Sequence, residues 1–199
     1  ILPYLSSERT DFLTYQTDVC TEINSAGFKV GADVVVNEND DKFVAWAWGD
    51  ASTGTKGATL AVNTTGSINS RIKPNTDSKF SYGTYEGTGS AATIGHGLGV
   101  VPEFILIKMI NTQPTSGFDW TVYHKDNTSS PETDYLVLNS TAATADNTFF
   151  NDTAPTNAVF SIGTADVVNK DNRHYQFYAF ASVKGFSKMG TYTGNANAN

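Results

Sequence analysis

Charged residues are scarce in this sequence, and no stretch of it has the composition of a long amphipathic helix. Of its 199 residues only 17% are charged, and segments rich in Leu, Glu, Lys and Ala are absent. Such segments, with apolar residues at helical spacing, are what predicts a surface helix. Thr, Asn, Ser, Ala and Gly fill much of the chain instead, and 12% of it is aromatic. The composition therefore favours an all-β fold.

The sequence also lacks clusters of Lys and Arg and long apolar runs. Its formal net charge is −7, whereas binding to nucleic acid or to an anionic membrane surface needs a concentrated positive patch. We therefore expect no nucleic-acid partner. No apolar run reaches the length of about 18 residues that crosses a bilayer as a helix, so we expect no membrane insertion.

Cysteine is nearly absent, and we expect no signal peptide at the start of the chain. Cys20 is the single cysteine, so it forms no disulfide within the chain, and we interpret it as a small buried apolar residue. The chain opens at Ile1 with ILPYLSS, which is typical of the middle of a strand and not of a signal peptide. We expect the sequence to be a segment of a longer protein.

One stretch of the sequence occurs twice. FKVGADVVVNENDDKFVAWAW, residues 28–48, returns in degraded form as FSIGTADVVNKDNRHYQFYAF, residues 160–180. A repeat at such a long spacing indicates a duplicated structural unit. The identical pairs are Phe28/Phe160, Gly31/Gly163, Val35/Val167, Val36/Val168, Asn37/Asn169 and Ala47/Ala179.

A second similarity sets the limits of this unit. GFSKMGTYTGN, residues 185–195, echoes KFSYGTYEGTG, residues 79–89. One unit therefore starts near Gly83 and runs through Phe180, and another begins at Gly190. The predicted organisation is the C-terminal half of one unit in residues 1–48, a linker or edge strand in 49–79, a complete β-sandwich unit in 80–182 and the start of a third unit in 183–199.

Short strands bounded by Asn, Asp, Pro or Gly are predicted within the complete unit. Residues 104–110 are the most apolar of them, and 118–124 alternate as a half-buried strand does. Such a series indicates an antiparallel β-sandwich with jelly-roll or Greek-key-like connections. The predicted strands are 82–86, 104–110, 118–124, 135–139, 159–162 and 175–181, with a glycine-rich loop at 95–102 and a further edge strand at 67–72.

Signals for catalysis are weak. Acyl transfer needs a histidine beside a nucleophile, but no GxSxG elbow accompanies His96, His124 or His174, and we expect structural roles for them. A glycosidase needs two carboxylates about 5–10 Å apart across a cleft, and sequence spacing pairs none of those available. We predict no catalytic residue and no cofactor. The candidate carboxylates are Glu86, Glu103, Asp119, Glu132 and Asp134.

A calcium loop is suggested by the alternating oxygen donors of residues 37–41. The stretch lacks the glycine and the final glutamate of an EF-hand loop. Its copy at 169–173 contains Lys170 and Arg173, whose charges would repel a metal ion. We predict a tight turn at both places and no metal.

Aromatic residues recur at matching positions of the two copies. Trp46 and Trp48 are two residues apart, so they share one face of a strand, and Tyr178 and Phe180 repeat the pattern. The bulk kept at both positions favours a core face. An exposed face would instead stack sugar rings, which makes Trp46, Trp48 and Tyr178 the glycan-binding candidates.

The order of several motifs resembles that of a repeat domain of unknown function found in structural, tail-fibre-like proteins of marine tailed bacteriophages. The similarity runs over nearly the whole chain and is strongest in residues 80–195. The motifs are VAWAW, TTGSINS, FSYGTYEGTGSAATIGHGLGVVPEFILIK, DWTVYH, YLVLNSTAA, NDTAP, VFSIGT and GFSKMGTYTGN.

The resemblance implies a non-enzymatic component of a virus particle. We expect a tail-fibre or appendage protein, or a capsid decoration, that acts by assembly and adhesion. Its partners would be further copies of itself or other virion proteins, with a homo-oligomer as the functional form. Two alternatives stay open: a glycan-binding module that recognises a host surface, and a polysaccharide depolymerase.

Overall fold

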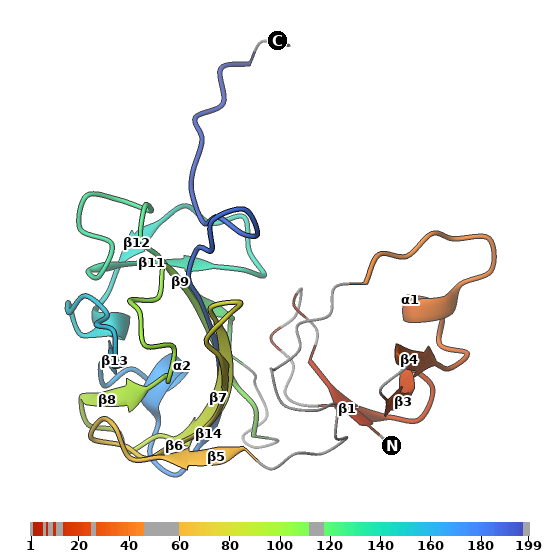
Figure 1. The fold of residues 1–199 in the computed structure, drawn as a ribbon, viewed down its shortest axis with the longest axis horizontal. Helices are drawn as coiled ribbons and strands as arrows, with labels where there is room; N and C mark the ends of the chain where they lie inside the picture. Colours follow the sequence, from red (N-terminus) through yellow and green to blue (C-terminus); the bar gives the residue numbers. More distant parts are fainter. Residues whose placement is uncertain are drawn as a thin grey trace.

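The chain is nearly all β, as its composition predicts, and it forms an antiparallel β-sandwich (Figure 1). The computed structural model describes residues 2–5, 7, 10, 14–24, 27–45, 60–111 and 118–196. Helical structure in these ranges is confined to α1 (Val34–Asn37), α2 (Asp166–Asn169) and the 3-10 turn η1 (Thr148–Phe150). The strands are β1 (Leu2–Tyr4), β2 (Thr14–Gln16), β3 (Cys20–Asn24), β4 (Gly27–Val30), β5 (Ala61–Asn63), β6 (Ser70–Asn75), β7 (Phe80–Glu86), β8 (Ala92–Gly95), β9 (Phe104–Met109), β10 (Thr121–His124), β11 (Asp134–Val137), β12 (Ala145–Asp146), β13 (Val159–Ile162) and β14 (His174–Phe180).

The main sheet has eight strands in the order β12-β11-β10-β9-β14-β7-β6-β5. Every neighbouring pair in it is antiparallel. Strand β14 lies between β9 and β7, where Tyr175 is opposite Met109 on one side and opposite Tyr85 on the other. Strand β14, the last strand of the sandwich, is therefore hydrogen-bonded to β7, which lies far earlier in the sequence.

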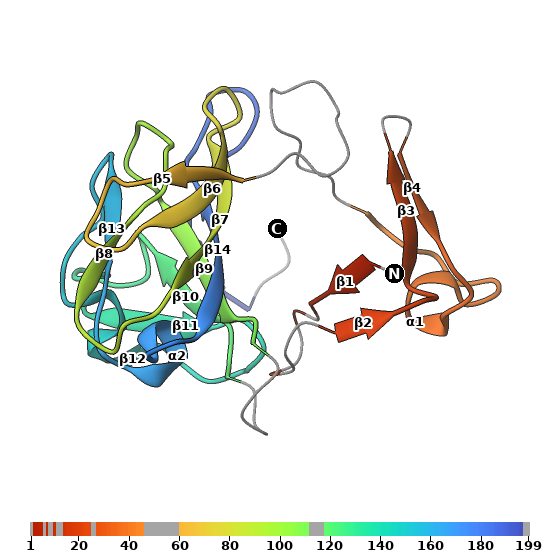
Figure 2. The same ribbon diagram turned by 90° about the horizontal axis from the view of Figure 1, so that it is seen from below.

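The core lies between this sheet and a second layer formed by the β8–β13 pair and α2 (Figures 1 and 2). Along β14, Tyr175, Phe177 and Ala179 are fully buried, while the residues between them face the other side of the sheet. Phe160 on β13 meets Phe177 edge-on, with 5.2 Å between the ring centroids. Burying each such large side chain contributes about 1.5–3 kcal/mol, so the contact between the two layers carries much of the stability.

The structure confirms several predicted strands and corrects two. In place of the edge strand predicted at 67–72, β6 begins at Ser70 and pairs with β5 on one side and β7 on the other. The predictions for 104–110, 159–162 and 175–181 correspond to β9, β13 and β14. The prediction for 118–124 is wrong in part, because β10 begins only at Thr121 and its first three residues are all buried. Strand β10 lies inside the sheet between β9 and β11 with both faces covered, so the alternation expected of a half-buried strand does not apply to it.

Two further antiparallel pairs, β1–β2 and β3–β4, precede the sandwich and lie to one side of it (Figure 2). The side chain of Lys108 on β9 is buried, and its Nζ donates a hydrogen bond to Thr10 O at 3.0 Å. This bond ties the N-terminal part to the main sheet. Among the described residues, no helix has the length and apolar character that crossing a membrane requires.

His96 follows β8 and is completely buried. The backbone N–H of Leu98 donates to its Nδ1 at 3.2 Å. The neutral ring therefore carries its proton on Nε2, which lies 3.1 Å from the carbonyl oxygen of Thr156. Burial lowers the pKa of His96, although the bond to Thr156 acts in the opposite direction. The residue is structural, as the sequence predicts.

The lowered pKa of His96 predicts a pH dependence of stability. A group whose pKa is lower in the folded state stabilises the fold fully above its unfolded pKa of about 6.5, and this contribution is lost as pH falls through the folded pKa. Urea unfolding between pH 8 and pH 5 should show the free energy of unfolding falling more steeply for the natural chain than for a His96→Gln variant. Parallel pH profiles for the two proteins would contradict this assignment.

Candidate functional site

The predicted glycan-binding residues fall partly outside the described ranges. Trp46 and Trp48 lie there, and Tyr178 is half-buried on the face of β14 that points away from the core. The ring of Tyr178 stacks on Trp120 with 6.2 Å between centroids, and its hydroxyl accepts a hydrogen bond from Gln176 Nε2 at 3.0 Å. Burial raises the pKa of Tyr178. Trp120 is 5% exposed, so Tyr178 is the partly exposed member of this pair and the one predicted glycan-binding residue that lies within the described ranges.

The candidate carboxylates each have their own surroundings. Glu103 forms an ion pair with Lys125 at 3.2 Å, and Asp119 accepts a hydrogen bond from Asn139. Asp134 accepts one from Thr128, and Glu86 lies 4.0 Å from His174. The negative charge of Glu132 helps raise the pKa of Tyr123 to about 12, after burial as the larger cause.

The residues after β13 form a compact turn around the buried side chain of Asn169. Its Nδ2 donates to Gly163 O and to Ser90 O, each at 2.7 Å, and its Oδ1 accepts from the backbone N–H of Thr88 at 2.9 Å. One amide therefore satisfies three backbone groups. Because Thr88 and Ser90 follow β7, these bonds join the end of the sandwich to its beginning.

A pair of tyrosines makes the same connection. Tyr85 on β7 is buried and stacks on Tyr175 of β14 with 5.1 Å between centroids. The Tyr85 hydroxyl donates to the carbonyl oxygen of Val168 in α2 at 2.6 Å. Burial raises the pKa of Tyr85 far above its usual value, and the nearby Tyr175 adds to the effect. This hydroxyl therefore remains a donor across the physiological pH range.

Gly87 completes the connection immediately after β7. Its N–H donates to Arg173 O at 2.8 Å, and its carbonyl oxygen accepts from Asn172 N at 3.0 Å. A Cβ at this position would lie 2.4 Å from Lys170 O, so only glycine fits here. The backbone of β7 is thus locked against the turn that leads into β14.

Residues 27–45, called here the open segment, have the same local structure as residues 159–177, the covered segment. Strand β13 begins 132 residues after β4, at Val159 against Gly27, and α2 begins 132 residues after α1, at Asp166 against Val34. The same left-handed backbone recurs in the turn after each helix, with φ of 67° at Asp40 and 55° at Asn172.

The hydrogen bonds and close contacts of the two segments correspond as well. Asn37 Nδ2 donates to Gly31 O at 2.8 Å, as Asn169 Nδ2 donates to Gly163 O at 2.7 Å. A Cβ on Gly31 would collide with Asp18 O, and one on Gly163 with Thr148 O. The turn of the open segment therefore forms from its own residues and from backbone hydrogen bonds to Val19 and Asp18, without a strand equivalent to β7.

The two segments differ in burial. Phe160 is 0% exposed and its counterpart Phe28 is 54% exposed; Tyr175 is 0% exposed and its counterpart Phe43 is 50% exposed. Asn169 is buried and Asn37 is exposed. Phe160 packs edge-on against Phe177 of β14, whereas strand β7 and the loop after it cover Tyr175 and Asn169. Among the described residues, nothing plays that part for the open segment.

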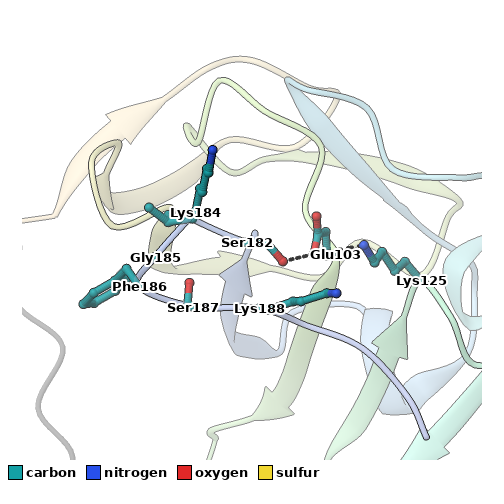
Figure 3. A pocket seen from close by; sticks show the side chains of 9 residues that line it. Glu103, Lys125, Ser182, Lys184, Gly185, Phe186, Ser187 and Lys188 are labelled. Atoms are coloured by element: carbon teal, nitrogen blue, oxygen red, sulfur yellow. Dashed lines mark hydrogen bonds and ion pairs between the residues drawn. The ribbon is translucent and has the colours of Figure 1, made fainter.

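The tail, residues 188–196, leaves the sandwich after a turn at 183–187 (Figure 3). The Ser182 hydroxyl donates to the carboxylate of Glu103 and accepts from Met189 N at 3.0 Å. Partial burial raises the pKa of Glu103, but hydrogen bonds from Ser182 and Lys125 and the charge of Lys125 outweigh it and leave the pKa below its usual value. This cluster anchors the base of the tail, and beyond it Tyr192 is 95% exposed.

The described residues contain no cluster of three or more His, Cys, Asp or Glu side chains arranged to hold a metal ion. Residues 37–41 form the end of α1 and the turn after it, as their copy at 169–173 does after α2. The role of Asn169 was not predicted. Its signal was present, since Asn37/Asn169 and Gly31/Gly163 are among the identical pairs of the two copies.

Comparison with known proteins gives one match. The model of a family described as a domain of unknown function, DUF7483, matches residues 3–199. No curated protein and no solved structure matches the chain.

The different burial of Asn169 and Asn37 predicts unequal costs of removing them. Asn169→Ala removes three hydrogen bonds to the backbone, one buried and two partly buried, and should lower the free energy of unfolding by about 3 kcal/mol. Asn37→Ala, the matched control, removes one exposed bond and should cost about 1 kcal/mol or less. Urea unfolding of the two variants measures the difference. Equal costs would show that the buried amide does not join the two ends of the sandwich.

Proposed function

The chain belongs to the DUF7483 family of domains of unknown function, and we propose that it is a non-enzymatic structural protein of a bacteriophage particle. Its role would be that of a tail-fibre or appendage component, or of a capsid decoration, which acts by assembly and adhesion. The observation that carries the proposal is the open segment, whose local structure is complete and whose apolar face is uncovered.

The likeness of the two segments supports a repeat architecture. Both have a strand, a glycine against a backbone carbonyl, a one-turn helix and a left-handed residue at the same spacing. We interpret them as the same part of two repeat units. Repeated units that do not cover their own faces gain stability from their neighbours, which gives a physical reason for a chain of such units.

The exposed face supports assembly energetically. Several of its large apolar side chains are at least half exposed, and burial contributes about 25 cal/mol for each Å² of apolar surface removed from water. Exposed apolar surface marks interaction sites in soluble proteins where it gathers in one region, and these side chains all belong to one segment, residues 27–45. The side chains are Phe28, Val34, Val35, Phe43 and Val44.

Self-assembly predicts a native mass above that of a single chain of 21.4 kDa. Light scattering after gel filtration should find a trimer or a larger assembly, and Phe28→Ser should shift the population towards monomer because it makes the uncovered face polar. Val101→Ser, at an equally exposed valine in the loop after β8, is the control and should leave the mass unchanged. A natural chain that stays monomeric at every concentration would refute assembly by this segment.

The particle location needs a separate test. Mass spectrometry of purified particles, followed by labelling with antibodies against this chain in electron microscopy, should place it on an appendage or on the capsid surface. Its absence from purified particles would refute a virion role and leave the assembly result unaffected.

Glycan binding is the second candidate function, and the observation that favours it is the stack of Tyr178 on Trp120 at the partly exposed face of the main sheet. If this face binds host glycans, Tyr178→Ala and Trp46→Ala should abolish adhesion to host cells while the circular dichroism spectrum stays native. Loss of folding would instead support the packing role. A reducing-sugar assay on host capsule separates binding from depolymerase activity, since binding alone releases no sugar.

A further inference from the structure

We propose that residues 190–194 of the tail, called here the tail strand, add as a β-strand to residues 41–45 of a second copy of this chain. The open segment of each copy would then be covered by the tail of the next, and copies would join head to tail. The inference rests on the proposed assembly function and names the surfaces through which assembly occurs.

The sequence of the tail strand identifies its partner. It reads GTYTG, and the same positions of β7 and the residue after it, 83–87, read GTYEG. Within the sandwich, β7 pairs with β14 so that Tyr85 is opposite Tyr175 and Gly83 is opposite Phe177. The residues that correspond to Tyr175 and Phe177 in the open segment are Phe43 and Ala45. The tail strand would therefore place Tyr192 opposite Phe43 and Gly190 opposite Ala45.

Both surfaces are available in the structure. Tyr192 is 95% exposed, whereas its counterpart Tyr85 is 2% exposed. Phe43 is 50% exposed, whereas Tyr175 is 0% exposed. Residues 41–45 and 190–194 belong to no strand within the described parts of the chain, and in Figure 1 the tail leads away from the sandwich. Exposed backbone groups of an extended segment can accept an added strand, and the one backbone bond already present at Asp41, to Glu38 O, has its counterpart between Arg173 and Lys170 in the covered segment.

The contacts of β7 give the expected contacts of the tail strand. The Tyr85 hydroxyl donates to Val168 O, so that of Tyr192 would donate to Val36 O of the second copy, with its ring against Phe43. Gly87 exchanges backbone hydrogen bonds with Arg173 and Asn172. Gly194 would exchange them with Asp41 and Asp40, and Asp40 already has the left-handed backbone that Asn172 uses.

Gly194 makes the inference testable without disturbing the free chain. A Cβ on Gly87 would collide with Lys170 O, and the matching atom for Gly194 is Glu38 O of the second copy. In the structure, nothing lies within 4 Å of a Cβ placed on Gly194. A side chain at this position is therefore harmless in the free tail and excluded in the docked one.

Copies joined in this way use two different surfaces, the open segment of one and the tail of the other. Such heterologous contacts produce a closed ring if the rotation between copies closes and a filament if it does not. Either product suits a component of a fibre or of a shell.

The first experiment compares Gly194→Val with the matched control Thr193→Val. Thr193 corresponds to Glu86, which is exposed at the end of β7, so valine fits there. Light scattering over a concentration series should give Gly194→Val a dissociation constant about tenfold larger than that of the natural chain, or more. Thr193→Val should assemble as the natural chain does. Thermal unfolding should be the same for both variants when dilute. Assembly that Gly194→Val leaves unchanged would overturn the tail-strand contact and leave assembly itself standing.

The second experiment tests register and occupant by disulfide formation. In a Cys20→Ser background, one chain carries Thr193→Cys and another carries Lys42→Cys, the position opposite it in the proposed register. The oxidised mixture should yield a covalent dimer of the two chains, at least about tenfold more than when Val44→Cys, two residues away, replaces Lys42→Cys.

The remaining outcomes each reject part of the inference. Equal yields at positions 42 and 44 would reject the register. A chain carrying both Thr193→Cys and Lys42→Cys that closes on itself, while the mixture gives no dimer, would show that each tail covers its own open segment. A natural chain that is monomeric throughout would refute the assembly function itself, which separates that failure from a failure of the tail-strand contact alone.

Discussion

The pairing of β14 with β7 is the contact on which the rest of the structure depends. It brings a strand from the end of the sandwich between two strands from its first half. The stacked tyrosines, the buried amide of Asn169 and the close approach at Gly87 all lie along this junction. Part of the burial of the covered segment therefore comes from a strand far back in the sequence, β7, which covers Tyr175 beside the contacts that β8 and β9 make.

The open segment shows which parts of this arrangement form without a covering strand and which parts need one. Its strand, helix turn and left-handed residue form without any equivalent of β7: the side chain of Asp33 accepts a hydrogen bond from Val35 N at the start of α1, and the amide of Asn37 donates to Gly31 O. Its aromatic residues would be buried only if a strand equivalent to β7 lay against them. No such strand lies against the open segment within the described part of the chain. The incomplete face is the physical basis of the assembly role proposed for this chain.

Composition, apolar runs and the internal repeat predict part of the fold from the sequence alone. Strands β9, β13 and β14 follow from apolar runs and alternation, and the all-β class follows from composition. The strand at 118–124 was misjudged because alternation reports one covered face, whereas β10 is covered on both. The N-terminal pairs β1–β2 and β3–β4 carry little periodic signal in their short strands. Asn169 acts through hydrogen bonds to Thr88 and Ser90, which are distant in the sequence and become its neighbours only in the folded chain. In the sequence, the one sign of its role was that it is identical to Asn37 of the other copy.

The most direct test of this account is hydrogen exchange at the backbone amides of residues 41–45, measured at low and at high protein concentration. If strands of other copies cover the open segment, these amides exchange rapidly when dilute and become protected when concentrated, while those of residues 173–177 stay protected throughout. Amides 41–45 that exchange equally fast at both concentrations would contradict the account, because the open segment would then remain uncovered in solution.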